Sequence, residues 1–481
     1  MKKYTRVFQI MFFLIFIQKT LGQPCYPDKI VTAAYATGGE SPYLNQVLWL
    51  TWGSTNETIY PYGRHNQDLR VGSKSYASIH LGGDAYLCVE AEIIKITGSP
   101  VKSYKSGMYS GDSFDKLYNI GGTDTSNQLV AGIINKNVQA LSTLTIKAKA
   151  SVYGRPIRIS GLVVADAESL ASNEYITATA KGAWSIVDVR KNLSAGAYYM
   201  AKRNEGNGEQ KIVFQQGNNS KTGAVTFLEF DNGAYDTEEN EFAVEFSASL
   251  KGGGYTALAL GLLTPNADLG DAPESYGTPI HLLHNLEITS DNIQVTPNSS
   301  TNVNTLSYTA GKLVPFQGRY LGTTAPDADN GPMYSIDAKG DDITGSAGPF
   351  EEDAWPEELR RISYLPHYVI GNELQADIAY NNGKVGDKIS GWIDFDVNGT
   401  FDDSERQTAV IQTAGFGVVT LKWIIPYSRV LKNTYVRLRY FDSKEDATKS
   451  DHTVNYGEVE DHRMYILVPQ ITNPMLPNKA K

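Results

Sequence analysis

The stretch with the most specific chemistry in this sequence is DFDVNGTFDDSE, residues 394–405. A twelve-residue calcium loop places oxygen ligands at positions 1, 3, 5, 7, 9 and 12, with glycine at position 6 for the sharp turn. Gly399 occupies the sixth position, and the ligand positions hold Asp394, Asp396, Asn398, Thr400 (through its carbonyl), Asp402 and Glu405. Hard oxygens at this spacing suit calcium. The pattern therefore predicts a calcium site.

The residues before this loop are typical of a strand rather than of a helix. In KISGWIDFD, Ile389 and Ile393 alternate with Ser390 and Asp394, and a period of two indicates a β-strand. The pair Asn398-Gly399 is also the preferred dipeptide of a tight hairpin turn. A plain acidic hairpin is therefore the alternative, although a hairpin can also present calcium ligands.

A second acidic segment lies between residues 325 and 355, in an irregular and polar part of the chain. Crowded carboxylates repel one another, and a bound cation would hold such a segment in place. The candidate ligands of a second metal ion are Asp327, Asp329, Asp341 and Asp342. Solvated loop carboxylates are the alternative interpretation.

The sequence contains no motif of a catalytic site. It has no His-Glu-x-x-His, no Gly-x-Ser-x-Gly, no phosphate-binding glycine loop and no cysteine pair at zinc spacing. We therefore expect no catalytic residues and no enzyme. A secreted carbohydrate-active hydrolase, which would need two carboxylates across a cleft, and a structural matrix component are the alternatives.

Two tyrosines are weak candidates for ligand binding. Tyr60 and Tyr62 lie in the proline-interrupted stretch NETIYPYGRH, close in sequence to Trp49 and Trp52. Exposed aromatic rings stack on sugars and on peptide side chains. Trp49 itself is interpreted as a core residue.

The N-terminus predicts export. Residues 1–22 combine Lys2, Lys3 and Arg6 with the apolar run Ile10–Ile17, which is typical of a secretory signal peptide and too short to span a bilayer. No later stretch predicts a transmembrane segment, so we expect a secreted, extracellular or cell-surface protein. The two cysteines, Cys25 and Cys88, predict one disulfide in an exported chain, with two unpaired thiols as the alternative.

The remaining pattern predicts an all-β protein. Strict alternation recurs in TLTIKAKASV, FAVEFSASL and YVRLRYF, which is typical of antiparallel strands packed on one face. A Pro-, Gly- and Asp-rich stretch near residue 265 separates two domains: 23–265, and 266–469 with an acidic, loop-rich first part. Residues 470–481 form a flexible tail. The net charge of −10 makes nucleic acid an unsuitable partner.

Two families share motifs with this chain. NYGEVEDHRMYI, with Gly457 to Asp461, resembles the signature of the GEVED domain, and DLGDAPESYGTP and GWIDFDVNGTFDDSE are similar to other parts of that β-sandwich. YLNQVLWLTWG and GLVVADAESLASNEYITATAKGAWSI resemble the lectin-like, non-repetitive domain of CshA-type fibrillar adhesins. The resemblance implies a jelly-roll-like sandwich that adheres to an extracellular protein or glycan, followed by a GEVED-type sandwich. We therefore expect an adhesin-like binding protein with acidic loops stabilised by calcium.

Overall fold

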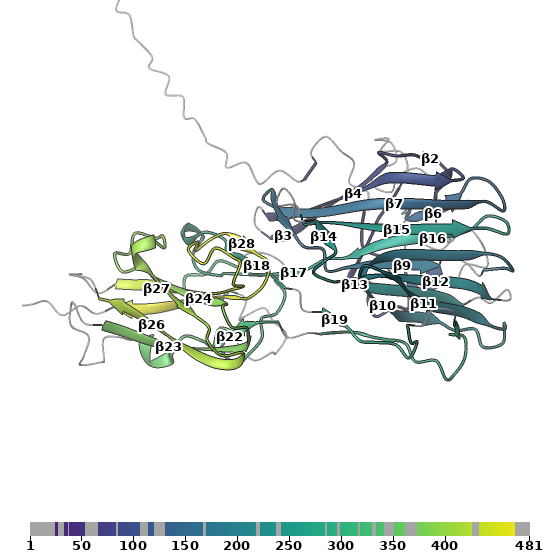
Figure 1. Ribbon diagram of the computed structural model, residues 1–481. Coiled ribbons are helices and arrows are strands. Elements are labelled where there is room, and N and C mark those ends of the chain that lie inside the picture. The colour runs from purple at the N-terminus through teal and green to yellow at the C-terminus, as the bar shows by residue number, and fades with distance from the viewer. Residues whose placement is uncertain are drawn as a thin grey trace, which may run out of the picture.

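The computed structural model describes residues 25–466, except for 27–32, 37, 53–65, 83–84, 106–113, 120–129, 167–169, 218–221, 237–241, 284–285, 296–298, 316–317, 330–332, 341–350, 361–372 and 426–431. It consists of two β-sheet bodies that lie side by side (Figure 1). The predicted all-β class is confirmed. The helical pieces among the described residues are single turns: α1 (Phe114–Leu117), η3 (Glu274–Tyr276), η4 (Glu357–Leu359) and η6 (Asp403–Glu405). The predicted signal peptide and tail lie outside the described residues.

The first body is a sandwich of two antiparallel layers joined by the long strand β10 (Tyr175–Arg190). One layer is ordered β2–β5–β6–β16–β9–β13–β10, and β1 pairs with β16. Its strands are β1 (Val47–Trp49), β2 (Asp68–Leu69), β5 (Val101–Tyr104), β6 (Gly132–Asn135), β9 (Gly161–Asp166), β13 (Gly223–Phe230) and β16 (Ala257–Leu263).

The other layer is ordered β3–β4–β7–β15–β10–β12–β11. Its strands are β3 (Lys74–Gly82), β4 (Ala85–Gly98), β7 (Leu141–Val152), β15 (Ala243–Lys251), β12 (Glu209–Gly217) and β11 (Tyr198–Gly206). The short strands β8 (Arg155–Ile157) and β14 (Tyr235–Asp236) pair with β7 and β15, respectively. Strand β10 changes layer at Gly182, whose φ is +150°. A Cβ atom there would lie 2.1 Å from the Glu229 carbonyl oxygen, so the corner requires glycine.

Alternation predicts the core of this sandwich correctly. In β7, Leu144, Ile146 and Val152 are fully buried, whereas the alternate residues Thr145, Lys147 and Lys149 are more exposed. The first layer is buried on both faces, because Trp49 and Tyr118 pack in a second cluster with Val163 and Phe227. The structure also joins Cys25 to Cys88 by a disulfide with a Cα–Cα distance of 5.5 Å, which holds the N-terminal segment against β4.

The segment after residue 265 packs against both bodies. Leu269, Ile280 and Leu282 belong to the hydrophobic core of the first sandwich. They lie on β17 (Asn266–Leu269) and β18 (Ile280–Leu283), which pair with each other, and β18 pairs in parallel with β28 (Thr453–Val454). The composition of the chain therefore changes at residue 265, but the packing continues past it, because apolar side chains beyond this residue complete the core of the first sandwich.

Residues 286–295 and 299–315 also lie on the first sandwich rather than within the second. Strand β20 (Thr301–Asn302) pairs with β11, and β19 (Leu286–Ile288) pairs with β21 (Leu313–Pro315). Buried Asp291 accepts a hydrogen bond from Lys202 at 3.0 Å and another from the backbone N–H of Ile186 at 2.6 Å. The part predicted as the loop-rich start of the second domain is thus held by polar contacts that its composition did not show.

The second body is a smaller sandwich. One sheet is ordered β22–β23–β26 and the other β25–β24–β27–β29, all antiparallel. Their bounds are β22 (Tyr320–Leu321), β23 (Glu373–Gly383), β26 (Gly415–Ile424), β25 (Arg406–Val410), β24 (Lys388–Ile393), β27 (Lys432–Phe441) and β29 (Val459–Ile466). Trp355, Trp423, Ile378 and Leu438 lie in the core between the sheets.

One sequence expectation about this sandwich is wrong. The alternation in YVRLRYF predicts that Arg437 and Arg439 face solvent, yet both are fully buried. Asp461 pairs with Arg437, and His281 accepts a hydrogen bond from Arg439 at 2.9 Å. Partners from distant segments make the burial of these cations possible, and such partners leave no trace in local alternation.

Candidate metal site

The predicted calcium loop connects β24 to β25. Strand β24 ends at Ile393 and β25 begins at Arg406, so the loop spans residues 394–405, and Asn398-Gly399 is not a tight two-residue hairpin. Val397 and Gly399 both have positive φ, +57° and +87°, which bends the chain back on itself. The loop closes with the single turn η6, where the side chains of Asp402 and Glu405 each accept a backbone N–H from the other end of the turn.

Asp394 anchors the loop from the end of β24. Its side chain is fully buried and accepts backbone N–H bonds from Asn398 at 3.2 Å and Gly399 at 3.0 Å. The hydroxyl of Tyr276, on η3, donates to its Oδ2 at 2.6 Å. Three donors therefore hold this one carboxylate in place. The loop is thereby attached to the segment that links the two bodies.

Three of the predicted ligands come together. One side-chain oxygen each of Asp394, Asp396 and Glu405 lies within 4.8 Å of the other two. Burial raises the pKa of Glu405 to about 7, and the charges of Asp394 and Asp396 add to this effect. Within the described residues, neither Asp394 nor Glu405 forms an ion pair with a basic side chain. The donor set of hard, crowded oxygens therefore fits a divalent cation such as calcium.

The other predicted ligands are hydrogen-bonded to one another. Asn398 Oδ1 accepts bonds from the Thr400 N–H at 2.8 Å and its hydroxyl at 2.7 Å. Asn398 Nδ2 donates to Asp402 Oδ2 at 3.0 Å. These three residues line the same turn, and among the described acids the carboxylate of Asp402 does not belong to the cluster of Asp394, Asp396 and Glu405.

The second predicted metal site is only partly described. Asp341 and Asp342 lie outside the described residues, as do Tyr60 and Tyr62. Asp329 accepts the backbone N–H of Leu269 at 2.6 Å and so fixes the end of β17, whereas Asp327 is exposed. Within the described part of the chain, neither residue belongs to a cluster of possible metal ligands.

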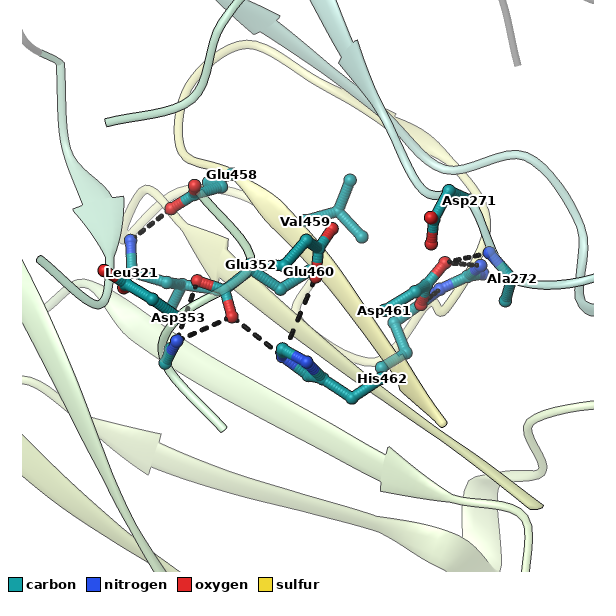
Figure 2. Close-up of polar contacts among 12 residues, drawn as sticks. Asp271, Ala272, Leu321, Glu352, Asp353, Glu458, Val459, Glu460, Asp461 and His462 are labelled. Atoms are coloured by element: carbon teal, nitrogen blue, oxygen red, sulfur yellow. Dashed lines mark hydrogen bonds and ion pairs between the residues drawn. The ribbon is translucent and has the colours of Figure 1, made fainter. Parts of the chain in front are cut away.

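A buried cluster that sequence reasoning missed lies at the GEVED motif. Glu352, Glu460 and His462 place one ligand atom each within 4.8 Å of the others, and all three are buried. His462 Nε2 lies 2.8 Å from Glu460 Oε2 and 3.7 Å from Glu352 Oε2 (Figure 2). The alternation of Glu458, Glu460 and His462 was visible in the sequence, but their burial was not.

The tautomer of His462 indicates that this cluster is a hydrogen-bond network rather than a metal site. Arg360 Nη2 lies 3.2 Å from His462 Nδ1, and a guanidinium can only donate. Nδ1 is therefore the acceptor, and Nε2 carries the proton that it donates to Glu460. A metal on Nε2 would require a proton on Nδ1, facing the guanidinium. Burial also lowers the pKa of His462 and raises that of Glu460, so the imidazole is neutral.

The acids of the motif tie distant segments to β29 (Figure 2). Glu458 accepts the backbone N–H of Leu321, Glu460 accepts that of Ala354 at 2.9 Å, and Asp461 accepts that of Ala272 at 2.9 Å. Each bond satisfies a buried backbone donor. The motif therefore organises the second sandwich from its last strand.

A cavity of about 610 Å³ lies where the two bodies meet. Its polar lining includes Arg158, Glu229 and Tyr235 from the first body and Arg319 and Tyr456 from the second. The guanidinium of Arg158 lies 4.7 Å from the Tyr235 ring centroid, and that of Arg319 lies 5.1 Å from the Tyr456 ring centroid. One face of each tyrosine ring is therefore covered by a guanidinium.

Comparisons with known proteins find two family models that match this chain. Residues 45–263 match the family model of the surface adhesin CshA non-repetitive domain 2, and residues 388–465 match that of the GEVED domain. A solved N-terminal domain of the Streptococcus gordonii adhesin Sgo0707 aligns over 90% of this chain and 87% of that chain, with 6% identity and a TM-score of 0.31. No curated protein matches the chain significantly. None of the helices in the described residues is long and apolar enough to cross a membrane.

Proposed function

The chain carries a CshA-type non-repetitive domain followed by a GEVED domain, and from this premise we propose an adhesin-like binding protein without catalytic activity. The first sandwich contacts an extracellular protein or glycan. The second sandwich supports it, and calcium orders the acidic loop at residues 394–405. The match over residues 45–263, which spans nearly the whole first sandwich, carries this proposal.

Calcium supports the binding function indirectly. Tyr276 joins Asp394 to η3, and β17, just before η3, packs its Leu269 in the core of the first sandwich. An ion held by Asp394, Asp396 and Glu405 would cancel the repulsion among three carboxylates and fix this junction. An ion that binds only the native state stabilises it by about 2.7 kcal/mol at 100 times its dissociation constant.

Thermal unfolding tests the calcium part of the proposal. The full chain is melted with calcium and with chelator, and the measurements are repeated for the double variant Asp394→Ala with Asp396→Ala. We expect calcium to raise the Tm of the parent protein and to leave that of the variant unchanged. Asp403→Ala is the matched control, because Asp403 is an exposed acid of the same loop outside the cluster. Equal melting temperatures with and without calcium would contradict a calcium site.

Binding to immobilised extracellular matrix proteins and glycans tests the adhesin part. We expect saturable binding by the full chain, reduced in Tyr60→Ala with Tyr62→Ala. Tyr153→Ala is the control, since Tyr153 is an exposed tyrosine in the turn between β7 and β8. Hydrolysis of any offered glycan, abolished by one acid-to-amide change, would support the hydrolase alternative instead.

A further inference from the structure

Strand β26 is the edge of its sheet and exposes an apolar face. Among the described residues it pairs with β23 on one side and with no strand on the other. Phe416 is 64% exposed, Val418 55% and Ile424 63%. A long edge strand with exposed apolar side chains is a template for pairing with another strand. Figure 1 places β26 in the part of the second body away from the first sandwich.

The charged residues on this face have polar partners within the sheet. Lys422 Nζ lies 2.8 Å from Glu373 Oε1, and the Thr420 hydroxyl donates to Asp377 at 2.6 Å. Covering the face would therefore leave no cation without a partner. The apolar side chains remain exposed. A fitting partner is therefore a strand that places apolar side chains opposite them.

The sequence of β26 is complementary to itself in antiparallel orientation. When the strand is paired with a second copy about a two-fold axis through Thr420, Phe416 lies opposite Ile424 of the copy and Val418 opposite Lys422 of the copy. Thr420 then lies opposite its own counterpart. Aromatic–β-branched and Thr–Thr pairs stabilise antiparallel strands, and no like charges face each other directly. A shift of the register by two residues leaves Phe416 or Ile424 without a partner.

We propose that two copies of this chain associate through β26, pairing edge to edge in this register. The two three-stranded sheets, each β22–β23–β26, become one continuous sheet across the two-fold axis. Such an interface is isologous, because the same surface serves both copies. It goes beyond ligand binding by the first sandwich and does not depend on calcium or on the identity of the ligand.

Register-specific disulfide cross-linking of the full chain tests the proposal. The native cysteines are joined to each other, so an introduced cysteine is the only free thiol. Facing residues of an antiparallel pair have Cα atoms roughly 4.5–5.5 Å apart, within the range that a disulfide bridges. We expect Thr420→Cys to form a covalent dimer under mild oxidation. Val418→Cys and Lys422→Cys should cross-link efficiently when mixed and poorly when separate.

Gln375→Cys is the matched control. Gln375 is exposed on the same face but lies on β23, one strand away from the edge, so its cross-linking reports random collision. Sedimentation of the unmodified protein should show a concentration-dependent dimer that Phe416→Glu with Ile424→Glu shifts to monomer, with an unchanged circular dichroism spectrum. A monomer at every concentration, or Thr420→Cys cross-linking no faster than Gln375→Cys, would overturn the proposal.

Discussion

Arg437 and Asp461 form a two-pronged ion pair that is completely buried. Arg437 Nε lies 2.8 Å from Asp461 Oδ1, and Nη2 lies 2.7 Å from Oδ2. Arg437 also donates to the carbonyl of Tyr276 at 2.8 Å. The pair therefore joins β27, β29 and η3, and through η3 it reaches the loop of Asp394.

Breaking this pair should strongly destabilise the second sandwich. Asp461→Asn leaves the Arg437 charge buried without its partner, and we expect a loss of about 3–5 kcal/mol in the free energy of unfolding. Urea denaturation measures the change. Asp403→Asn, which breaks the exposed pair with Arg406, is the control and should change stability by less than about 1 kcal/mol. A similar small effect of both variants would refute the structural role.

One substitution in the acidic loop, at Val397, should raise the stability of the protein by relieving backbone strain. Val397 has φ +57°, and a β-branched residue is strained there, whereas asparagine tolerates this conformation. We expect Val397→Asn to stabilise the protein by about 1 kcal/mol. Chemical denaturation with chelator present measures this effect without the contribution of any ion. The conservative Val397→Ile should bring no gain, and a loss of stability in Val397→Asn would argue against this backbone geometry.

The disulfide should stabilise the first sandwich in particular. Cys25 and Cys88 are 63 residues apart, and a cross-link that closes such a loop restricts the unfolded chain. We expect Cys25→Ser with Cys88→Ser to lose about 2–4 kcal/mol. Denaturation of the parent protein with and without reductant is the companion measurement. If reductant shifts the unfolding of the double-serine variant as well, the effect does not arise from this bond.

Acid should weaken the second sandwich through His281. The ring is fully buried, with Nε2 accepting from Arg439 and Nδ1 donating to the carbonyl of Tyr456. Burial, with the charges of Arg439, His452 and Arg437, lowers the pKa of His281 well below 6.5. Below pH 6.5 the unfolded state therefore binds a proton that the folded state does not, so stability falls as the pH falls.

The slope from this one group is at most about 1.4 kcal/mol per pH unit. The raised pKa values of Glu458 and Glu460 act in the opposite direction, so the difference between variants is the informative quantity. We expect His281→Gln to have a lower stability at pH 7 but a shallower decline between pH 6.5 and 5 than the parent. Unfolding free energies across that range measure it, and parallel curves would contradict the assignment.

Much of the fold could be predicted from residue patterns, because alternation records burial on one face of a strand. Leu144, Ile146 and Val152 show this in β7. The same reasoning fails at Arg437 and Arg439, where both faces of β27 are buried and distant partners supply the compensation.

The candidate metal site was likewise predictable where local spacing decides and unpredictable where distant residues meet. The spacing of Asp394, Asp396 and Glu405 predicted an acidic cluster, and the structure gathers these three carboxylates. The sequence spacing did not predict that Tyr276 donates a hydrogen bond to Asp394, because the two residues are far apart in the sequence. The cluster of Glu352, Glu460 and His462 was hidden for the same reason. Calcium itself remains a proposal.

The packing of β17 and β18 has a practical consequence for dissecting the molecule. A fragment that begins at residue 266 would expose Leu269, Ile280 and Leu282, which the intact protein shelters in the first core. A fragment that ends at residue 265 would open the same core from the other side. The two fragments on either side of residue 265 are therefore poor candidates for separate expression. Because they share a core, a force applied to one sandwich would be transmitted to the other.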